Sequence, residues 1–245
     1  MTTKSEMPFL EHLTELRTSL IHTLSGISIA TIITYYWSDL VFSILTHPIR
    51  ENFQDIALIG TGPAEAFMVK IKAAFISGAL LSSPYSFLQL WKFISPGLHE
   101  NEKKFAKPFV FFTTFFFLAG VVFCYYAVFP FTFQFFREEY SSIGVAANIK
   151  IGEYLSFVST LLLVFGVVFE LPVLSYILAR LGLLTHTWLI AKVRFIIVGI
   201  FVAAGVLTPP DVISQLLLAM PLLFFYGLCI LVTYWVNLER TNQTN

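Results

Sequence analysis

Charged residues are scarce in this chain of 245 residues. Asp, Glu, Lys and Arg together make up 12% of it, whereas 57% of the residues are hydrophobic. Soluble domains carry about 25% charged and about 45–50% apolar residues, so this composition excludes an ordinary water-facing surface. The formal net charge is zero, which argues against a nucleic-acid-binding surface. The composition indicates an integral membrane protein.

Residues that bind metals or act as nucleophiles are also few and scattered. Cys124 and Cys229 each lie inside an apolar run without a second cysteine or a histidine at metal-ligand spacing. The five histidines are dispersed along the chain, and no nucleophile–base pair stands out. We therefore expect no enzyme activity, no metal site and no cofactor. Acidic residues precede the first apolar run, so we expect no cleavable signal peptide.

Six stretches are long and apolar enough to cross a bilayer, which takes about 20 residues. The predicted spans are residues 18–38, 67–91, 108–136, 154–179, 195–208 and 212–236, and the fifth is short. Residues 1–245 are predicted to form a single all-α membrane domain. Prolines in or near the ends of spans, Pro84 and Pro172 among them, predict kinked helices and hence a concave bundle.

The distribution of basic residues predicts the orientation of the spans. Six spans put both termini on one side of the membrane. Of the 15 Lys and Arg residues, ten lie at the termini or in the loops on that side, and five lie in or near the opposite loops. Positively charged loops remain on the cytoplasmic side. Both termini are therefore predicted to be cytoplasmic.

Two carboxylates on the predicted cytoplasmic side are not explained by orientation. Glu15 lies with Glu11 on one face of a short amphipathic helix that precedes the first span, and Glu102 lies in the first cytoplasmic loop. One interpretation is a solvated acidic face. The other is a binding site for a basic ligand, because an anionic lipid surface would not attract these residues. Arginine would suit such a site best, since its planar fork binds carboxylates through two hydrogen bonds.

Three further polar residues lie in or beside spans. Glu170 interrupts the fourth span, where a charge costs about 2.5–3.5 kcal/mol on insertion scales. It is either hydrogen-bonded within the bundle, bonded to a neighbouring protein's helix, or part of a proton pathway. Asp211 suits an N-terminal helix cap. Gln215 either bonds across a helix interface or lies near the outer membrane surface.

Several motifs in order resemble the TatC family, the core signal-peptide receptor subunit of the twin-arginine protein translocase. The resemblance covers residues 9–234 and rests on residues 12–17 (HLTELR), 83–84 (SP) with Gln89, Trp91 and Phe93, 96–98 (PGL), 102–104 (EKK), 165–172 (FGVVFELP) and 208–215 (TPPDVISQ). It implies binding of Arg-Arg signal peptides, export of folded proteins by the proton-motive force, and a multi-pass location in the cytoplasmic (inner) membrane. It also implies TatA-like and TatB-like single-span partners and self-association, with no role for nucleic acid.

The resemblance also implies roles for individual residues. Glu15 and Glu102 match the family's acidic signal-peptide site, and Arg17 and Phe93 match residues that line the same cytoplasmic surface. The intramembrane glutamate that faces partner helices corresponds to Glu170. The remaining matches are a partner-contact region that includes Asp211 and Gln215, and a proline of the first outer loop, Pro48.

Two other functions remain as alternatives. A proton-coupled secondary transporter of small molecules would use Glu170 and Asp211 as relay groups and would bind its substrate near the bilayer midplane. A membrane insertase or scaffold without signal-peptide specificity would not require Glu15 and Glu102 together.

Overall fold

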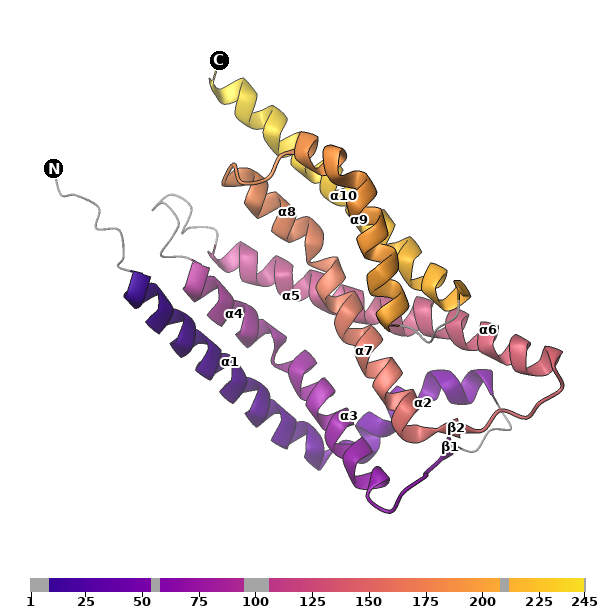
Figure 1. Ribbon diagram of the computed structural model, residues 1–245. Helices are drawn as coiled ribbons and strands as arrows, with labels where there is room; N and C mark the ends of the chain where they lie inside the picture. The colour runs from indigo at the N-terminus through magenta and orange to yellow at the C-terminus, as the bar shows by residue number, and fades with distance from the viewer. Residues whose placement is uncertain (1–8, 54–57, 95–105, 208–211, 245) are drawn as a thin grey trace. The chain divides into compact units, whose positions relative to one another are not determined.

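The computed structural model describes residues 9–53, 58–94, 106–207 and 212–244 (Figure 1). Helices dominate these residues, as a chain in a bilayer must satisfy its backbone hydrogen bonds within each span. The elements in chain order are α1 (Phe9–Tyr36), α2 (Ser38–Asn52), β1 (Leu58–Ile59), α3 (Glu65–Leu81), α4 (Ser83–Ile94), α5 (Ala106–Phe123), a π-helical turn (Cys124–Val128), α6 (Phe129–Ser142), β2 (Ile149–Lys150), α7 (Ile151–Phe169), α8 (Leu171–Arg180), α9 (His186–Leu207) and α10 (Val212–Thr244).

Long apolar helices account for the predicted spans. Five segments of the described chain are long and apolar enough to cross a membrane, namely Leu13–Tyr36, Pro108–Ser142, Ile151–Arg180, His186–Leu207 and Gln215–Glu239. The α3–α4 pair passes the same test across a bend of 56°, and as one broken span it brings the number to six. The predicted all-α, multi-span fold with kinked helices is confirmed.

Prolines explain the breaks within three of these spans. Each lacks the N–H that would bond to the carbonyl four residues earlier, and its ring crowds that carbonyl. Pro84 follows the bend between α3 and α4, and Pro172 follows the break between α7 and α8. Pro130 follows the π-helical turn Cys124–Val128, a local widening that inserts an extra residue into the turn. The breaks beside Pro84 and Pro172 therefore arise where the sequence predicts them, whereas Pro221 lies within the continuous helix α10.

The fifth span is longer than predicted. Helix α9 begins at His186 rather than at residue 195 and contains 22 residues, enough for about 33 Å. Lys192 and Arg194 interrupt the apolar run, so the predicted span begins after them. Long basic side chains near a helix end reach the membrane surface while their stems stay apolar, and Lys192 Nζ lies 5.7 Å from the centre of the Phe195 ring. Helices α1 and α10 likewise extend beyond the predicted spans.

The chain packs as two compact units, defined by the residues that contact one another. The first unit contains Met1–Ser43 and Phe67–Phe115, and the second contains Ile44–Ala66 and Phe116–Asn245. In the first unit α1 packs against α3 and α4 through small residues such as Ala30, Ala73 and Ala74, all buried. Thr34 Oγ1 of α1 donates a hydrogen bond of 2.7 Å to the carbonyl of Ala74, so a polar contact adds to this apolar packing.

The second unit has α7 at its core. Leu155, Val158, Leu161, Leu162 and Phe165 of this helix are each at most 2% exposed. Its second half continues into α8, which packs on α10, and α10 also packs on α9. The side chains of Leu189 and Cys229 are buried between α9 and α10, where the Tyr226 hydroxyl donates to the Leu189 carbonyl at 2.6 Å.

Ordered elements also lie between the first and second predicted spans and between the third and fourth. The first of these segments includes α2, and a short parallel strand pair joins it to the second, with Leu58 opposite Ile149 and Ile59 opposite Lys150. This pair belongs to the second unit. It brings the segment before α3 against the start of α7.

Candidate functional site

Two of the predicted signal-peptide residues lie near the start of α1. Glu15 is half-buried and Arg17 is exposed. Leu13 and Leu16 on the same turns are each 43% exposed. This end of the helix therefore presents apolar and charged groups together, which suits a ligand that is itself amphipathic.

The packing of α1 against α3 and α4 determines which residues lie level with Glu15. A methyl group at Gly78 would lie 2.6 Å from the Thr31 backbone nitrogen, and one at Gly26 would lie 2.6 Å from the Tyr85 ring. Helix α1 is thus antiparallel to α3 and α4, and it packs closely against them at these two glycines. From Gly26 to Glu15, α1 rises about 16 Å, and from Tyr85 to Phe93 α4 rises about 12 Å. Glu15 and Phe93 therefore lie within about one helical turn of each other in height.

The start of α5 lies at the same end of the first unit. The rings of Trp91 and Phe109 are 4.6 Å apart between centroids, and Trp91 is buried. The two helices that flank residues 95–105 are thereby joined near Phe93. Glu102 itself lies outside the described residues.

Pro84 is exposed at the start of α4. The neighbouring hydroxyl residues Ser82 and Ser83 are buried at the bend, and Ser86 Oγ donates to the Ser82 carbonyl at 3.1 Å. The bend redirects α4 along α1, which positions Phe93 at the end of the unit that carries Glu15.

Glu170 is the residue between α7 and α8 in the second unit. Its backbone N–H donates to the Val167 carbonyl at 3.0 Å, and its own carbonyl accepts from Leu174 at 2.8 Å. The Oε1 atom is buried without a hydrogen-bond partner in the described part of the chain, and the carboxyl group meets the backbone of Phe117. An unsatisfied buried carboxyl oxygen is costly, so Glu170 has an acceptor to offer to a donor from another molecule.

Exposed apolar side chains surround Glu170 on one face of its helix. Val167, Leu171 and Leu174 are 59%, 37% and 50% exposed, and residues three before and four after Glu170 share its face. On the packed side, the Phe169 ring lies 4.2 Å from the ring of Phe225. The carboxyl group therefore borders a surface that faces lipid or a partner helix.

The close approach of α5 to α7 supports this part of the second unit. A methyl group at Gly120 would overlap the Phe165 carbonyl oxygen and would lie 2.9 Å from Cγ of Phe169. On the facing helix, a methyl group at Gly166 would lie 2.5 Å from the Phe117 ring. Glycine at both positions lets the two helices meet directly before the break at Glu170.

Gln215 forms the cross-helix bond that was one of its two predicted roles. Its Nε2 donates to the Phe201 carbonyl at 2.7 Å and thereby joins α10 to α9. The side chain is half-buried, and Gly205 leaves room for it. Asp211 lies outside the described residues.

Pro48 is buried within α2, and it changes the hydrogen bonding of the carbonyl four residues earlier. Because it has no N–H, it leaves the carbonyl of Ile44 without its usual helical donor. The Tyr125 hydroxyl donates to that carbonyl at 2.8 Å, and the Tyr154 hydroxyl donates to the next one, that of Leu45, at 2.7 Å. Pro48 thus leaves the Ile44 carbonyl as an acceptor for Tyr125.

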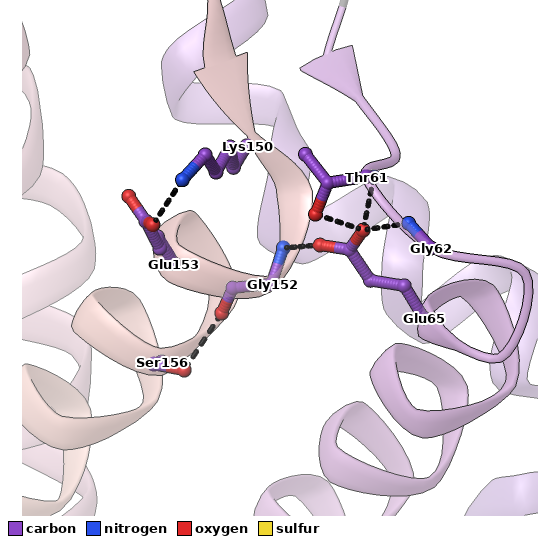
Figure 2. A network of polar contacts seen from close by, with 7 residues as sticks. All are labelled: Thr61, Gly62, Glu65, Lys150, Gly152, Glu153 and Ser156. Carbon is purple, nitrogen blue, oxygen red and sulfur yellow. Dashed lines mark hydrogen bonds and ion pairs between the residues drawn. The ribbon is translucent and has the colours of Figure 1, made fainter.

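A polar cluster around Glu65 was not identified from the sequence (Figure 2). Its Oε2 accepts hydrogen bonds from the backbone N–H and hydroxyl of Thr61 and from the N–H of Gly62, and its Oε1 accepts from the N–H of Gly152 at 3.0 Å. An acidic residue in the first turn of a helix is a recognisable signal. Its partner Gly152, far away in the sequence, carries no such signal.

A family model described as the Sec-independent protein translocase protein TatC matches residues 11–221. The chain belongs to the TatC family. The matched range includes both the Glu15 end of the first unit and the Glu170 break of the second.

Curated relatives agree with the family model. A TatC protein of Helicobacter pylori (strain ATCC 700392 / 26695) is 42% identical and covers 96% of this chain and 90% of its own length. One of Desulforapulum autotrophicum is 38% identical, with 93% and 84% covered. Both are named Sec-independent protein translocase protein TatC, a name that denotes a translocase component and no catalysed reaction.

Solved structures share the fold. A crystal structure described as the twin-arginine translocase receptor TatC superimposes with a TM-score of 0.86 at 31% identity, covering 92% of this chain and 99% of that one. A second TatC receptor structure, in the detergent DDM, gives 0.84 at 32% identity, covering 90% and 98%. The family resemblance predicted from the sequence is confirmed, and the chain is a multi-pass membrane protein of the translocase family.

Proposed function

We propose that this TatC-family chain is the core receptor subunit of a twin-arginine translocase and binds Arg-Arg signal peptides through Glu15 and Glu102. The observation that carries the proposal is that Glu15 of α1 and Phe93 of α4 lie at nearly the same height, at one end of the first unit. Helix packing at Gly26 and Gly78 produces this arrangement, and the helices that flank residue 102 meet at the same end.

Carboxylates suit this ligand for physical reasons. A guanidinium group bonds a carboxylate through two parallel N–H donors, a geometry that lysine lacks. Glu15 is half-buried, so its interactions are less screened by water than those of a surface charge. Arg17 and Phe93 would line the same surface, and exposed Leu13 and Leu16 would accept the apolar part of a signal peptide.

The proposed site lies on the cytoplasmic side of an inner membrane, with both termini on that side. Arg17 and exposed Lys92 lie at the Glu15 end of the first unit. The exposed aromatic side chains of Tyr36 and Trp37 lie at the other end of α1. From Arg17 to Tyr36 the helix rises about 28 Å, close to the hydrocarbon thickness of a bilayer, about 30 Å. Basic residues at one end and aromatic residues at the other fit a cytoplasmic end and an outer interface.

Glu170 is the proposed contact for single-span partners of the TatA and TatB kind. A buried, unsatisfied Oε1 beside exposed Val167 and Leu174 suits a helix that brings one polar donor to an otherwise apolar surface. Such hydrogen bonds between membrane helices contribute about 0.6–2 kcal/mol. Gln215 and Asp211 would belong to the same partner-contact region. The two units would act as one domain, self-associate, and export folded proteins with the proton-motive force.

Peptide binding tests the proposal directly. The full-length protein in detergent is titrated with a labelled signal peptide that carries Arg-Arg, and with a matched peptide that carries Lys-Lys. We expect tight binding of the first peptide and at least about tenfold weaker binding of the second, since a charge-assisted hydrogen bond contributes about 1.5–3 kcal/mol. Glu15→Gln and Glu102→Gln should each remove this preference.

Glu153→Gln is the matched control. Glu153 is exposed and paired with Lys150 at 3.0 Å, far from the Glu15 end in the sequence, so its loss should leave binding unchanged. Equal binding of both peptides by a folded sample, or unchanged affinity in both carboxylate variants, would refute the receptor proposal. The secondary-transporter alternative is not favoured, because the relatives and solved structures are protein translocase components.

A further inference from the structure

The N-terminus of α7 lacks a cap of its own. Lys150, the residue before the helix, has an extended backbone and no capping side-chain hydrogen bond. The first N–H groups of a helix have no partner within the helix. One of them, that of Gly152, donates to Oε1 of Glu65 at 3.0 Å. Glu65, the first residue of α3, therefore supplies the cap.

The turn before α3 holds this carboxylate in place. Oε2 accepts from the Thr61 hydroxyl at 3.1 Å and from the Gly62 N–H at 3.3 Å, and it also accepts from the Thr61 N–H. Figure 2 shows the carboxylate between the Thr61–Gly62 turn and the first turn of α7. A negative charge at a helix N-terminus is further favoured by the helix dipole. Glu65 thus connects two segments through both of its oxygens.

Gly152 has no side chain, which leaves room for this carboxylate. A methyl group at Gly152 would lie only 2.7 Å from Oε1 of Glu65, closer than the two atoms can approach. A larger residue at position 152 would displace the Glu65 carboxylate from this contact. The neighbouring strands pair through only two residues each, and so short a pair is weak by itself. Glu65 and Gly152 therefore supply the directional part of this contact.

The other end of α7 carries Glu170. The helix is continuous from Ile151 to Phe169, so it transmits a constraint at its first turn to its last. Its core residues, such as Leu155 and Leu162, are buried and apolar. The hydrogen bond adds a directional constraint to this packing, because it requires donor and acceptor within a narrow range of distance and angle.

We propose that Glu65 caps α7 across the outer loops and is a positioning residue for Glu170. The hydrogen bond to Gly152 holds the first turn of α7, and together with the close contacts at Gly120 and Gly166 it sets the position of α7 along its axis and hence the depth of the intramembrane carboxyl group. The consequence for partner binding rests on the function proposed above. The effect of Glu65 on the position of α7 concerns only the second unit and does not depend on that function.

Two substitutions break the contact from opposite sides. Glu65→Ala removes the acceptor, and Gly152→Ala keeps the acceptor but fills the space that it needs. Gly60→Ala is the matched control for the glycine, since a methyl group there would meet only Oε2 of Glu65 at an ordinary 3.8 Å. Glu153→Ala is the control for the carboxylate, because it removes an exposed acid from the same turn of α7.

Hydrogen exchange of the Gly152 amide measures the cap in the full-length protein. We expect exchange to accelerate about tenfold or more in Glu65→Ala, as expected for loss of a charge-assisted bond, and to accelerate also in Gly152→Ala. Glu65→Gln, which keeps one acceptor oxygen but turns an amide toward Thr61 or Gly62, should give an intermediate rate. Both controls should exchange like the parent protein.

Spin labels report the position of Glu170. Val167 and Phe224 are exposed and lie on α7 and α10 of the second unit, so Val167→Cys and Phe224→Cys carry the labels in a chain whose buried Cys124 and Cys229 are changed to alanine. We expect the inter-label distance distribution to shift or broaden in Glu65→Ala and Gly152→Ala and to remain unchanged in the two controls.

Three results would decide between positioning, simple loop anchoring and failure of the proposed function. An unchanged exchange rate of the backbone amide at position 152 in both variants would refute the cap. Faster exchange with an unchanged distance distribution would refute positioning and leave Glu65 as a loop anchor. Neither measurement uses a signal peptide or a partner, so a negative peptide-binding result would refute the receptor proposal without affecting this one. Co-purification of the partner should fall in both variants while peptide binding persists.

Discussion

Replacing Gly120 by alanine should destabilise the second unit more than the size of one methyl group suggests. The added methyl group would overlap the carbonyl oxygen of Phe165, and it would also lie 2.9 Å from the Phe169 ring and 3.0 Å from the Phe165 carbonyl carbon. Two of these three atoms are backbone atoms of α7, which cannot rotate away as a side chain can. Relief therefore requires α5 and α7 to move apart.

The expected magnitude follows from this geometry. Overpacking by one methyl group costs about 1–3 kcal/mol where the surroundings cannot adjust. Alanine also favours the helix over glycine by about 0.8–1.0 kcal/mol, which offsets part of that cost in any glycine-to-alanine change. Gly227→Ala isolates this second effect, because Gly227 lies in α10 of the same unit with nothing within 4 Å of the added methyl group. Gly120→Ala should therefore be less stable than Gly227→Ala by about 1–3 kcal/mol.

Thermal unfolding in detergent provides the assay. Cys124 and Cys229 are both buried, so a maleimide dye that fluoresces on reaction with thiols reports their exposure as the protein unfolds. For a chain of this size the midpoint should fall by roughly 2–10 °C in Gly120→Ala relative to Gly227→Ala. Equal midpoints for the two variants would show that α5 and α7 do not approach as closely as the structure indicates.

The remaining predictions concern the partner contact and the topology. Glu170→Ala should leave signal-peptide affinity within about twofold of the parent, because a change of less than about 0.4 kcal/mol is expected for a residue outside that site, but it should reduce co-purification of single-span partners. Normal co-purification and transport would show that Glu170 is dispensable. Exposed Lys92 should react with a membrane-impermeant amine reagent only from the cytoplasmic side and exposed Lys150 only from the outer side; the reverse pattern would overturn the orientation.

Hydropathy and proline position carried most of the fold prediction. A stretch of about 20 apolar residues must be helical in a bilayer, whatever lies beside it, so the spans could be located without knowing their neighbours. Pro84 and Pro172 predicted breaks for an equally local reason, since the missing N–H belongs to the residue itself. The family motifs could also be read in order along the chain, and the family assignment is confirmed.

The start of the fifth span was predicted wrongly, because charged residues with long side chains lie within the helix. The fifth span was predicted to begin after Arg194, whereas α9 begins at His186. A count of charges treats Lys192 and Arg194 as breaks, although their stems are apolar enough to remain beside the helix. Hydropathy also did not predict α2 (Ser38–Asn52), which lies between the first two predicted spans.

Some residues of the candidate site could be selected from the sequence, and others required the structure. Glu15 and Glu170 could be selected from the sequence, because an acidic residue beside a membrane or within it requires an explanation. Their roles in binding remain predictions. Glu65 was not selected from the sequence, because nothing in the sequence links it to Gly152. Pro48 was known only as a family match until the structure showed which carbonyl it leaves for Tyr125.

The sequence by itself determined that this protein spans a membrane as kinked helices and belongs to the TatC family, because hydropathy, proline and short motifs act over a few neighbouring residues. Only the tertiary structure decided that Glu15 lies level with Phe93, that Glu170 keeps a buried, unsatisfied oxygen, and that Glu65 caps α7. These facts depend on the close approach of helices at glycines such as Gly26, Gly78 and Gly120. Such contacts join residues far apart in the chain, and their geometry arises only once the helices pack.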